Sequence, residues 1–376
     1  MSKKSLLFVS SLALLTLITA CSDDNDGALF DAEQPNYEFA AVDARFQKFL
    51  DDSDLFDGIS VTLVDQQQGT IHEAAFGDHS VDTVVMLAST SKMPAALLLM
   101  ALNDDASLNF DVSATIDNYL PWDGVYGDST TEQLVSNTSG IPGLTSVGKY
   151  GTHLCQYVGA SDFSGCAQTI YSTDIEGSVA PGTAFSYGGS QWQLAGAVAE
   201  SVGGASWDQL FAQYIAQPCE LEVFRFGNQW SDLDRWTGNP DSLIGVENPN
   251  IEGGAISNMR DYAKLLQLLL DGGRCGDTQV VSTESVEFLQ RDRGGPLGVP
   301  YAMGLWIQAP EDGSAATVFY DPGAFGSISW IDTARGYGGY VAIDDYSRTR
   351  AGEPVVLVLN EIISLVEQAI DEARAQ

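Results

Sequence analysis

The sequence predicts an α+β fold in which a domain of strands and helices is interrupted by a mainly helical insertion. Three observations support this prediction. Segments with strand-like composition lie towards both ends, at residues 58–77 and 301–343. Segments with helical spacing of apolar residues fill the middle of the chain. The chain has 376 residues, 44% of them hydrophobic, which is enough for a large core.

The first predicted elements lie before residue 103. Residues 38–51, YEFAAVDARFQKFL, have apolar residues at helical spacing. The stretch GISVTLVDQQQGTIHEAAFGD, residues 58–78, predicts two strands joined by a turn at Gln66 to Gly69. Residues 87–102, LASTSKMPAALLLMAL, start with small polar residues and continue as an apolar run, which predicts a buried helix.

Helices are predicted for the middle of the chain. TTEQLVSNTSGIPGL, residues 130–144, begins like a helix and is expected to stop at Gly140. Three later segments have amphipathic spacing, and two of them end in glycine pairs: residues 190–204, 206–218 and 256–273.

Strands return in the last third of the chain. Four segments have strand composition: residues 301–308, 316–320, 326–333 and 338–344. The final stretch, residues 354–376, predicts a helix, although its first part also fits a strand.

The charge is strongly acidic. With 17 basic and 51 acidic residues the formal net charge is -34, which disfavours binding to nucleic acid or anionic head groups. Such a surface suits salty water, where ions screen self-repulsion, and equally an ordinary acidic secreted protein. We expect no nucleic-acid partner, and the oligomeric state is left open.

Residues 1–20 have the pattern of a secretory signal peptide. Lys3 and Lys4 precede the apolar stretch LLFVSSLALLTLITA, which is too short for a comfortable transmembrane span and ends in small residues. The pattern predicts export from the cytoplasm.

The end of this segment, Leu17-Ile18-Thr19-Ala20-Cys21, resembles a bacterial lipobox. The resemblance implies cleavage before Cys21 and attachment of lipid to its sulfur, so that a membrane is a partner through this anchor. An ordinary signal peptide with an incidental cysteine is the alternative. Residues 21–37 are acidic and poor in apolar residues, and are interpreted as a lipidated tether. Ser22 after the cysteine favours the outer membrane, facing the periplasm.

Four further cysteines suggest two disulfides in an exported chain. Three pairings are possible. We favour Cys155–Cys166, which closes a short loop, and Cys219–Cys275, which joins distant segments.

No metal or other cofactor is expected. The three histidines are His72, His79 and His153, and no Cys/His cluster has zinc-ligand spacing. An α/β-hydrolase would need a Gly-x-Ser-x-Gly elbow and a histidine, and residues 188–192, GGSQW, fail at the last position.

Ser89 and Lys92 form a Ser-x-x-Lys pair at the start of the predicted buried helix. A serine hydroxyl is a weak nucleophile and needs a nearby base. Residues three apart lie on the same side of a helix, and a serine that opens a helix has its amide at an anion-binding terminus. Because burial disfavours the charged form of lysine, we expect Lys92 to be pushed towards the amine that a base requires.

A structural interpretation of the same pair remains open, namely a helix-capping serine with a lysine that extends to the surface. The pattern occurs a second time at Ser146 and Lys149, among glycines and with no apolar run behind it, and is interpreted there as a loop.

Five segments in order carry a resemblance to a known superfamily: VVMLASTSKMPAALLLMAL (84–102), TTEQLVSNTSGIPG (130–143), and residues 181–204, 248–273 and 321–343. Between about residues 40 and 370 the chain resembles the serine β-lactamases and penicillin-binding proteins, especially the class C and family VIII carboxylesterase branch. The resemblance implies an antiparallel sheet flanked by helices. It places an α/β domain at residues 38–88 and 250–376 and a helical domain at 89–249, with the active site at their interface.

The resemblance also implies roles for single residues. Ser89 would be the nucleophile, with Lys92 and Tyr187 as general base and acid. The backbone N–H groups of Ser89 and Ala324 would form the oxyanion hole. Tyr187 could instead be a buried aromatic residue in a glycine-rich turn.

Two positions depart from the family pattern. The Tyr-x-Asn motif has Gly189 in place of asparagine, for which Ser190 or Gln191 could substitute. The Lys-Thr-Gly or His-x-Gly motif is Asp321-Pro322-Gly323, which puts an anion where a substrate carboxylate would meet a cation. Asp321 could meet an amine or a hydroxyl, or be a surface acid.

These residues predict an exported serine hydrolase that cleaves a small ester or amide substrate through an acyl-Ser89 intermediate. The alternatives are a β-lactamase or D,D-peptidase, and a catalytically silent, surface-anchored binding homologue. Candidates for the substrate pocket are Gly189, Asp321, Gly323 and Trp192, and the aromatic residues Tyr150, Trp230 and Trp236 could line an acyl pocket.

Overall fold

A computed structural model describes residues 35–143, 150–230, 233, 236–310, 314–346 and 352–376. The predicted signal peptide, Cys21, most of the tether and the second Ser-x-x-Lys copy therefore lie outside the described residues. Across the described ranges, no helix combines the length and apolar character that a bilayer crossing requires.

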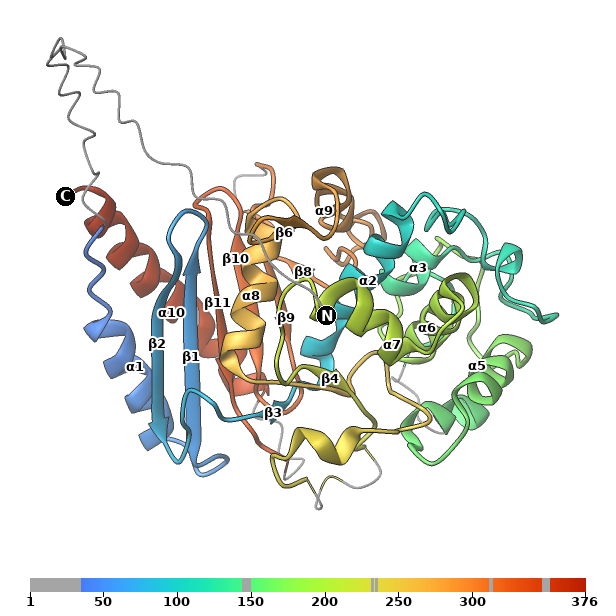
Figure 1. The fold of residues 1–376 in the computed structure, drawn as a ribbon, viewed down its shortest axis with the longest axis horizontal. Coiled ribbons are helices and arrows are strands. Elements are labelled where there is room, and N and C mark those ends of the chain that lie inside the picture. Colours follow the sequence, from blue (N-terminus) through green and yellow to red (C-terminus); the bar gives the residue numbers. More distant parts are fainter. Residues whose placement is uncertain (1–34, 144–149, 231–232, 234–235, 311–313, 347–351) are drawn as a thin grey trace, which may run out of the picture.

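One antiparallel sheet unites the two ends of the chain, and this confirms the predicted fold class (Figure 1). Its strand order is β2-β1-β11-β10-β9-β8. The strands are β1 (Gly58–Asp65), β2 (Gly69–Gly77), β8 (Trp306–Ile307), β9 (Val318–Pro322), β10 (Ile328–Asp332) and β11 (Tyr337–Ala342). β1 and β2 are joined by the predicted turn, and β1 pairs with β11 from Ser60 opposite Ala342 to Asp65 opposite Tyr337.

Helices cover both faces of this sheet, so β1 is buried along its whole length. α1 (Ala40–Asp51) and α10 (Gly352–Arg374) pack on one face, where Ile59, Val61 and Leu63 meet them. α8 (Met259–Leu270) packs on the other face, against β1 and β11. Because side chains alternate along a strand, the neighbouring Val64 belongs to the second core. The last segment of the chain is helical from Gly352, so the alternative of a strand there is wrong.

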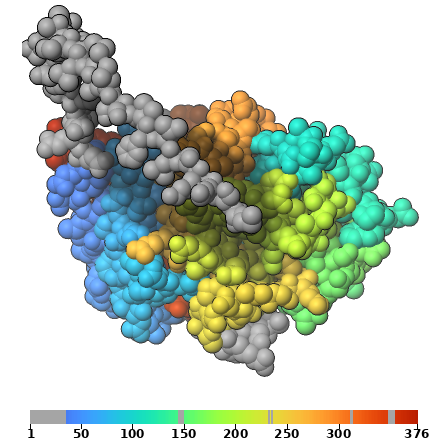
Figure 2. Space-filling model, viewed as in Figure 1, coloured from blue at the N-terminus to red at the C-terminus, as the bar shows by residue number. Residues whose placement is uncertain are grey.

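The helical part stands beside the sheet: in Figure 1 the orange and red strands lie between the blue strands and the cyan and green helices. Figure 2 shows the same division in space-filling form, with the blue residues on one side and the cyan and green residues on the other. The helices of this part are α2 (Lys92–Asp104), α3 (Thr131–Val135), α5 (Phe163–Ser172), α6 (Ser190–Gly203) and α7 (Trp207–Phe211), the last continued by a π-helical turn, η5 (Ala212–Ala216). α2 is buried from Lys92 to Leu102, which agrees with its apolar sequence.

Two predicted elements differ from the structure. α3 ends at Val135 instead of Gly140, because Asn137 already has a positive φ of 57°. The strand predicted at 301–308 is reduced to β8 and an isolated bridge at Tyr301. Gly304 interrupts it with a φ of 78° and approaches the backbone of Lys92 so closely that a Cβ would lie 2.8 Å from its carbonyl carbon. The irregularity thus fits this segment against the start of α2.

Short elements complete the fold. A small sheet has the order β3-β5-β4, and β6 pairs with β7. These strands are β3 (Val85–Met86), β4 (Arg225–Phe226), β5 (Ala255–Ser257), β6 (Arg274–Cys275) and β7 (Thr278–Gln279). The remaining helices are α9 (Thr283–Leu289) and the 3₁₀ turns η1 (Ala88–Ser91), η2 (Ile116–Asn118), η4 (Gly151–Tyr157), η7 (Pro240–Leu243) and η8 (Gly295–Leu297).

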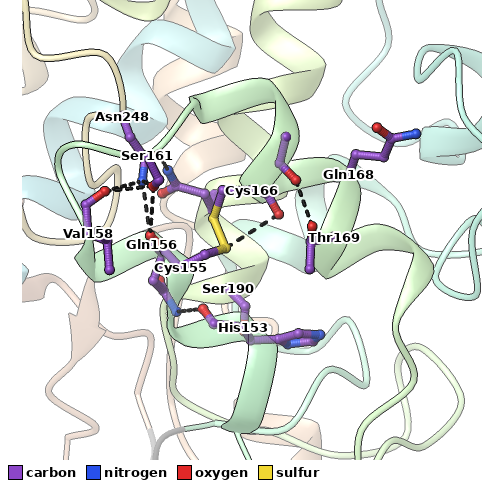
Figure 3. Close-up of a disulfide and its surroundings, with 12 residues drawn as sticks. His153, Cys155, Gln156, Val158, Ser161, Cys166, Gln168, Thr169, Ser190 and Asn248 are labelled. Atoms are coloured by element: carbon purple, nitrogen blue, oxygen red, sulfur yellow. Dashed lines mark hydrogen bonds between the residues drawn. A yellow bond between two sulfur atoms is a disulfide. The ribbon is translucent and has the colours of Figure 1, made fainter.

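Two disulfides hold the chain, with the pairing that the sequence favours. Cys155 in η4 is joined to Cys166 in α5, with Cα atoms 5.6 Å apart (Figure 3). Cys219, after η5, is joined to Cys275 in β6 across 56 residues of chain. The first disulfide fixes η4 against α5, and η4 also carries two residues, Gln156 and Tyr157, that reach the site described next.

Candidate active site

Ser89 lies in η1, the turn between β3 and α2, where strand, helix and sheet meet. Ala88 before it has a φ of 48°, a conformation that costs energy for a residue with a side chain. The neighbours on the other side are fixed by hydrogen bonds. Thr90 donates to the carbonyls of Asp321 and Ser327, at 3.2 and 3.1 Å, and Ser91 donates to that of Ala88. Among the four residues of η1, Ser89 alone is not buried, so its hydroxyl is held in place yet accessible.

The amino group of Lys92 lies next to this hydroxyl. Its side chain is completely buried, and Nζ lies 3.1 Å from Ser89 Oγ. Nζ also donates to the backbone carbonyl of Glu252 at 2.9 Å and lies 3.2 Å from the carboxylate oxygen Oε2 of the same residue. The structure therefore gives Lys92 a carboxylate partner that the sequence reasoning did not find.

Tyr187 completes the group. Its ring centre is 4.7 Å from Lys92 Nζ, and its side chain is within hydrogen-bonding reach of Ser89 and Lys92. The ring is held between aromatic neighbours, Trp306 stacked at 5.5 Å and Tyr301 edge-on at 6.1 Å. The structure thus brings Ser89, Lys92 and Tyr187 together.

The protonation state of Lys92 differs from the sequence-based expectation. Burial acts to lower its pKa, but the nearby acidic groups Tyr187, Glu252 and Asp321 outweigh burial and hold the pKa above the ordinary value for lysine. The expectation that burial would leave Lys92 neutral is therefore wrong for the resting site. Burial also raises the pKa of Tyr187, against the opposing effect of Lys92. At neutral pH the site holds an ammonium ion and a neutral phenol.

Asp321 is not a surface acid. Its side chain is completely buried, because it points to the same side of β9 as Phe319, towards α2. Its Oδ2 accepts a 3.3 Å hydrogen bond from the Met93 N–H, and Oδ1 has no hydrogen-bond partner among the described residues. Burial raises the pKa of Asp321 well above its ordinary value, against the opposing effect of the nearby Lys92. Asp321 thus puts no cation at the position that the Lys-Thr-Gly or His-x-Gly motif gives to lysine or histidine.

The turn after β9 carries Gly323 and Ala324 to η1. A Cβ on Gly323 would lie 2.1 Å from the Leu87 carbonyl oxygen and 2.7 Å from Thr90 Oγ1, so only glycine allows this approach. The Gly323 N–H donates to the Ser327 carbonyl at 2.7 Å, which closes the turn around the exposed Ala324. Gly323 thus acts through close packing against η1, and the oxyanion-hole role of the Ala324 N–H stays a prediction.

The other pocket candidates support the site from behind. Trp192 has no exposed surface, lies 5.7 Å from Lys92 Nζ and donates its indole N–H to Asn137, so it does not line an open pocket. Tyr150 is buried and accepts hydrogen bonds from the N–H and hydroxyl of Ser190. Trp230 and Trp236 are half-buried and belong to the cluster around Phe325, at the edge of the site.

A large cavity lies elsewhere on the described part of the chain. It has a volume of about 1040 Å³ and lies between the α7–η5 region and residues 243–249, with Trp207, Asp208 and Arg225 in its lining. Ser89, Lys92 and Tyr187 are absent from its lining. We therefore identify the site from its chemistry and not from cavity size.

Comparison with known proteins agrees with the fold. The beta-lactamase family model matches residues 42–354, and the chain belongs to this family, a family of β-lactamase-fold hydrolases. Among curated relatives, penicillin-binding protein 4 of Amycolatopsis lactamdurans is 24% identical over 305 residues, which span 73% of this chain and 75% of that protein.

Two solved structures illustrate the shared fold. A family VIII carboxylesterase superimposes with a TM-score of 0.67 at 20% identity, covering 90% of this chain and 99% of that one. A penicillin-binding protein homologue from Caulobacter crescentus gives a TM-score of 0.67 at 18% identity, with 91% and 99% covered. At these identities the similarity establishes the fold.

Proposed function

We propose that this protein is an exported serine hydrolase that cleaves an ester or amide bond through an acyl-Ser89 intermediate. The observation that carries the proposal is the contact of 3.1 Å between an accessible serine hydroxyl and a completely buried lysine amine. A nucleophile within hydrogen-bonding reach of a base, which is in turn oriented by a third group, is the arrangement that activates serine.

The proposed reaction has two halves. Ser89 Oγ bonds to the substrate carbonyl carbon while its proton passes to Lys92 in its amine form, and the N–H groups of Ser89 and Ala324 stabilise the oxyanion. The bond to the leaving group then breaks as Tyr187 or Lys92 returns a proton to that group. Water attacks the acyl-Ser89 carbon, releases the acid and restores the serine.

The Asp321-Pro322-Gly323 segment affects which class of substrate the site can favour. A β-lactam or a D-Ala-D-Ala stem presents a carboxylate, and Asp321, a buried acid, offers it no cation. A cation facing a carboxylate at about 4 Å contributes about 1–4 kcal/mol, and each 1.4 kcal/mol is about tenfold in affinity. The absence of this contact favours an uncharged ester or amide substrate.

We therefore expect purified mature protein to hydrolyse short-chain nitrophenyl esters with a kcat/KM at least about tenfold above that for nitrocefin. A panel of esters, amides and lactams measures this preference. Nitrocefin turnover equal to or above ester turnover would favour the β-lactamase or D,D-peptidase alternative, and loss of all turnover would favour the binding homologue.

We further propose that the protein is lipid-anchored through Cys21, on the basis of the lipobox-like residues before it. In an expressing bacterium fed labelled palmitate, the full chain is expected to carry label and to partition with membranes. The Cys21→Ala variant is expected to lose both properties, and label retained by that variant would contradict the anchor.

A further inference from the structure

Gly189 has an ordinary backbone conformation, with a φ of -84°, so its dihedral angles do not call for glycine. The space around Gly189, however, leaves no room for a larger residue. A Cβ built on Gly189 would lie 2.1 Å from Glu252 Oε1 and 2.2 Å from Gln156 Oε1, which are distances that packed atoms do not tolerate. The carboxylate of Glu252 occupies the place where a side chain of residue 189 would begin.

The residues next to Gly189 are committed elsewhere, so they do not replace a missing side chain at this point. Ser190 donates its hydroxyl to Tyr150 at 2.6 Å. The amide of Gln191 hydrogen-bonds to Ser139, Asn137 and two backbone carbonyls. The suggestion from the sequence that one of them substitutes is therefore wrong.

Glu252 is only 5% exposed, and each of its polar groups near the site is engaged. Its carboxylate oxygen Oε2 faces Lys92 Nζ at 3.2 Å, and its backbone carbonyl accepts from the same nitrogen. Its other carboxylate oxygen accepts a 2.6 Å hydrogen bond from the Tyr157 hydroxyl in η4. Ser89, Lys92 and Glu252 therefore form a continuous chain from nucleophile to base to carboxylate, with Tyr157 at its end.

We propose that Glu252 is the positioning residue for Lys92, and that its carboxylate takes the place of the side chain missing at Gly189. This inference rests on the proposed function, because it concerns the base of that reaction. Glu252 orients the amine towards Ser89 and, as its buried counter-ion, determines how readily Lys92 gives up its proton. The pair of Gly189 and Glu252 works as a unit, since the glycine makes the room that the carboxylate fills.

The charge balance around Lys92 leads to a test. The titratable groups around this site are Tyr150 just before η4, Tyr157 in η4, Tyr187 before α6, Glu252 before β5, Tyr301 before β8 and Asp321 in β9. The Glu252 carboxylate lies 3.2 Å from Lys92 Nζ, and it acts together with Tyr187 and Asp321 to raise the pKa of Lys92 against the effect of burial. Without it, the effect of burial on Lys92 is less opposed, and the pKa of Lys92 falls.

The experiment reads the titration of Lys92 directly, without relying on turnover. The full chain has six lysines, which is few enough to resolve in protein labelled with ¹³C at lysine Cε, and the Lys92→Met variant assigns the signal. We expect Glu252→Gln to lower the pKa of Lys92 by at least about one pH unit, which is tenfold in its proton affinity. Glu287→Gln, on the exposed face of α9, is the matched control and should leave the titration unchanged.

A second pair of variants covers the case in which Glu252→Gln does not fold. Gly189→Ala in the native background should displace the carboxylate and lower the pKa of Lys92, whereas the same change combined with Glu252→Ala should add little. An unchanged Lys92 titration in a folded Glu252→Gln or Gly189→Ala protein overturns the inference. If the protein hydrolysed no ester but Lys92 still responded to Glu252, the proposed function would fail while the positioning role stood.

A kinetic readout separates positioning from mere structural support. In an active protein, Glu252→Gln should move the rise of kcat/KM with pH to lower pH, in parallel with the Lys92 titration. A purely structural role would lower the rate at all pH values by the same factor, and that result would count against the inference.

Discussion

Replacing Ser89 with alanine is expected to lower ester hydrolysis by at least about 10⁴-fold, the scale on which loss of a serine nucleophile acts in hydrolases. The physical reason is that no other hydroxyl takes its position. Thr90 and Ser91, its neighbours in η1, are buried and donate their hydroxyls to backbone carbonyls. The measurement is kcat/KM for a nitrophenyl ester with purified protein.

The change should leave the fold intact, because Ser89 is the least buried residue of η1 and removal of its oxygen leaves no large cavity. Ser364→Ala, at an exposed position of α10, is the matched control and should keep full activity. A Ser89→Ala protein that retained more than about a hundredth of the native rate would point to another nucleophile.

Lys92→Arg is expected to reduce kcat/KM by about 10²–10⁴-fold, which is the usual contribution of a general base, even though it preserves the positive charge. Arginine remains protonated at any accessible pH and so cannot accept the proton of Ser89. If Lys92 served only as a counter-ion of Glu252, arginine would retain much of the activity. Lys48→Arg, on the exposed face of α1, is the control.

The pH dependence follows from the same group. Since the pKa of Lys92 is held above its ordinary value, the amine form is scarce at neutral pH and grows as pH rises. We therefore expect kcat/KM of the native protein to increase from neutral to alkaline pH for as long as the protein stays folded. A rate that falls over this range would mean that the ammonium form is the active one.

The fold could be predicted well from the sequence for two reasons. Most helices and strands are indicated by patterns within short segments, and five family-like segments occur in the expected order. Strand-like composition identified β1 and its neighbours, and the apolar run after Ser89 identified α2. The predictions failed where a tertiary contact decides the backbone, as at Gly304, which bends to fit the start of α2.

For the site, the motifs indicated which residues meet, but not their charge states. The argument for a neutral Lys92 counted burial alone, and it missed Glu252, which lies 160 residues away in the sequence. The sequence did contain one signal. The Tyr-x-Asn motif has Gly189 in place of asparagine, so another polar residue is expected near that position. Glu252 directly precedes Gly253-Gly254 in the family-like segment 248–273. Only the folded structure shows that this acid fills the vacant space. The burial of Asp321 follows from strand alternation with Phe319, which the sequence reasoning did not apply.

The central claim, that Ser89 attacks the substrate and carries the acyl group, is tested most directly by covalent trapping. The purified protein is treated with a serine-directed phosphonate, digested and mapped by mass spectrometry, with Ser89→Ala in parallel. We predict one adduct, on the peptide that contains Ser89, and none in the variant. An active protein that stayed unmodified at Ser89, or carried the adduct on another residue, would contradict this account.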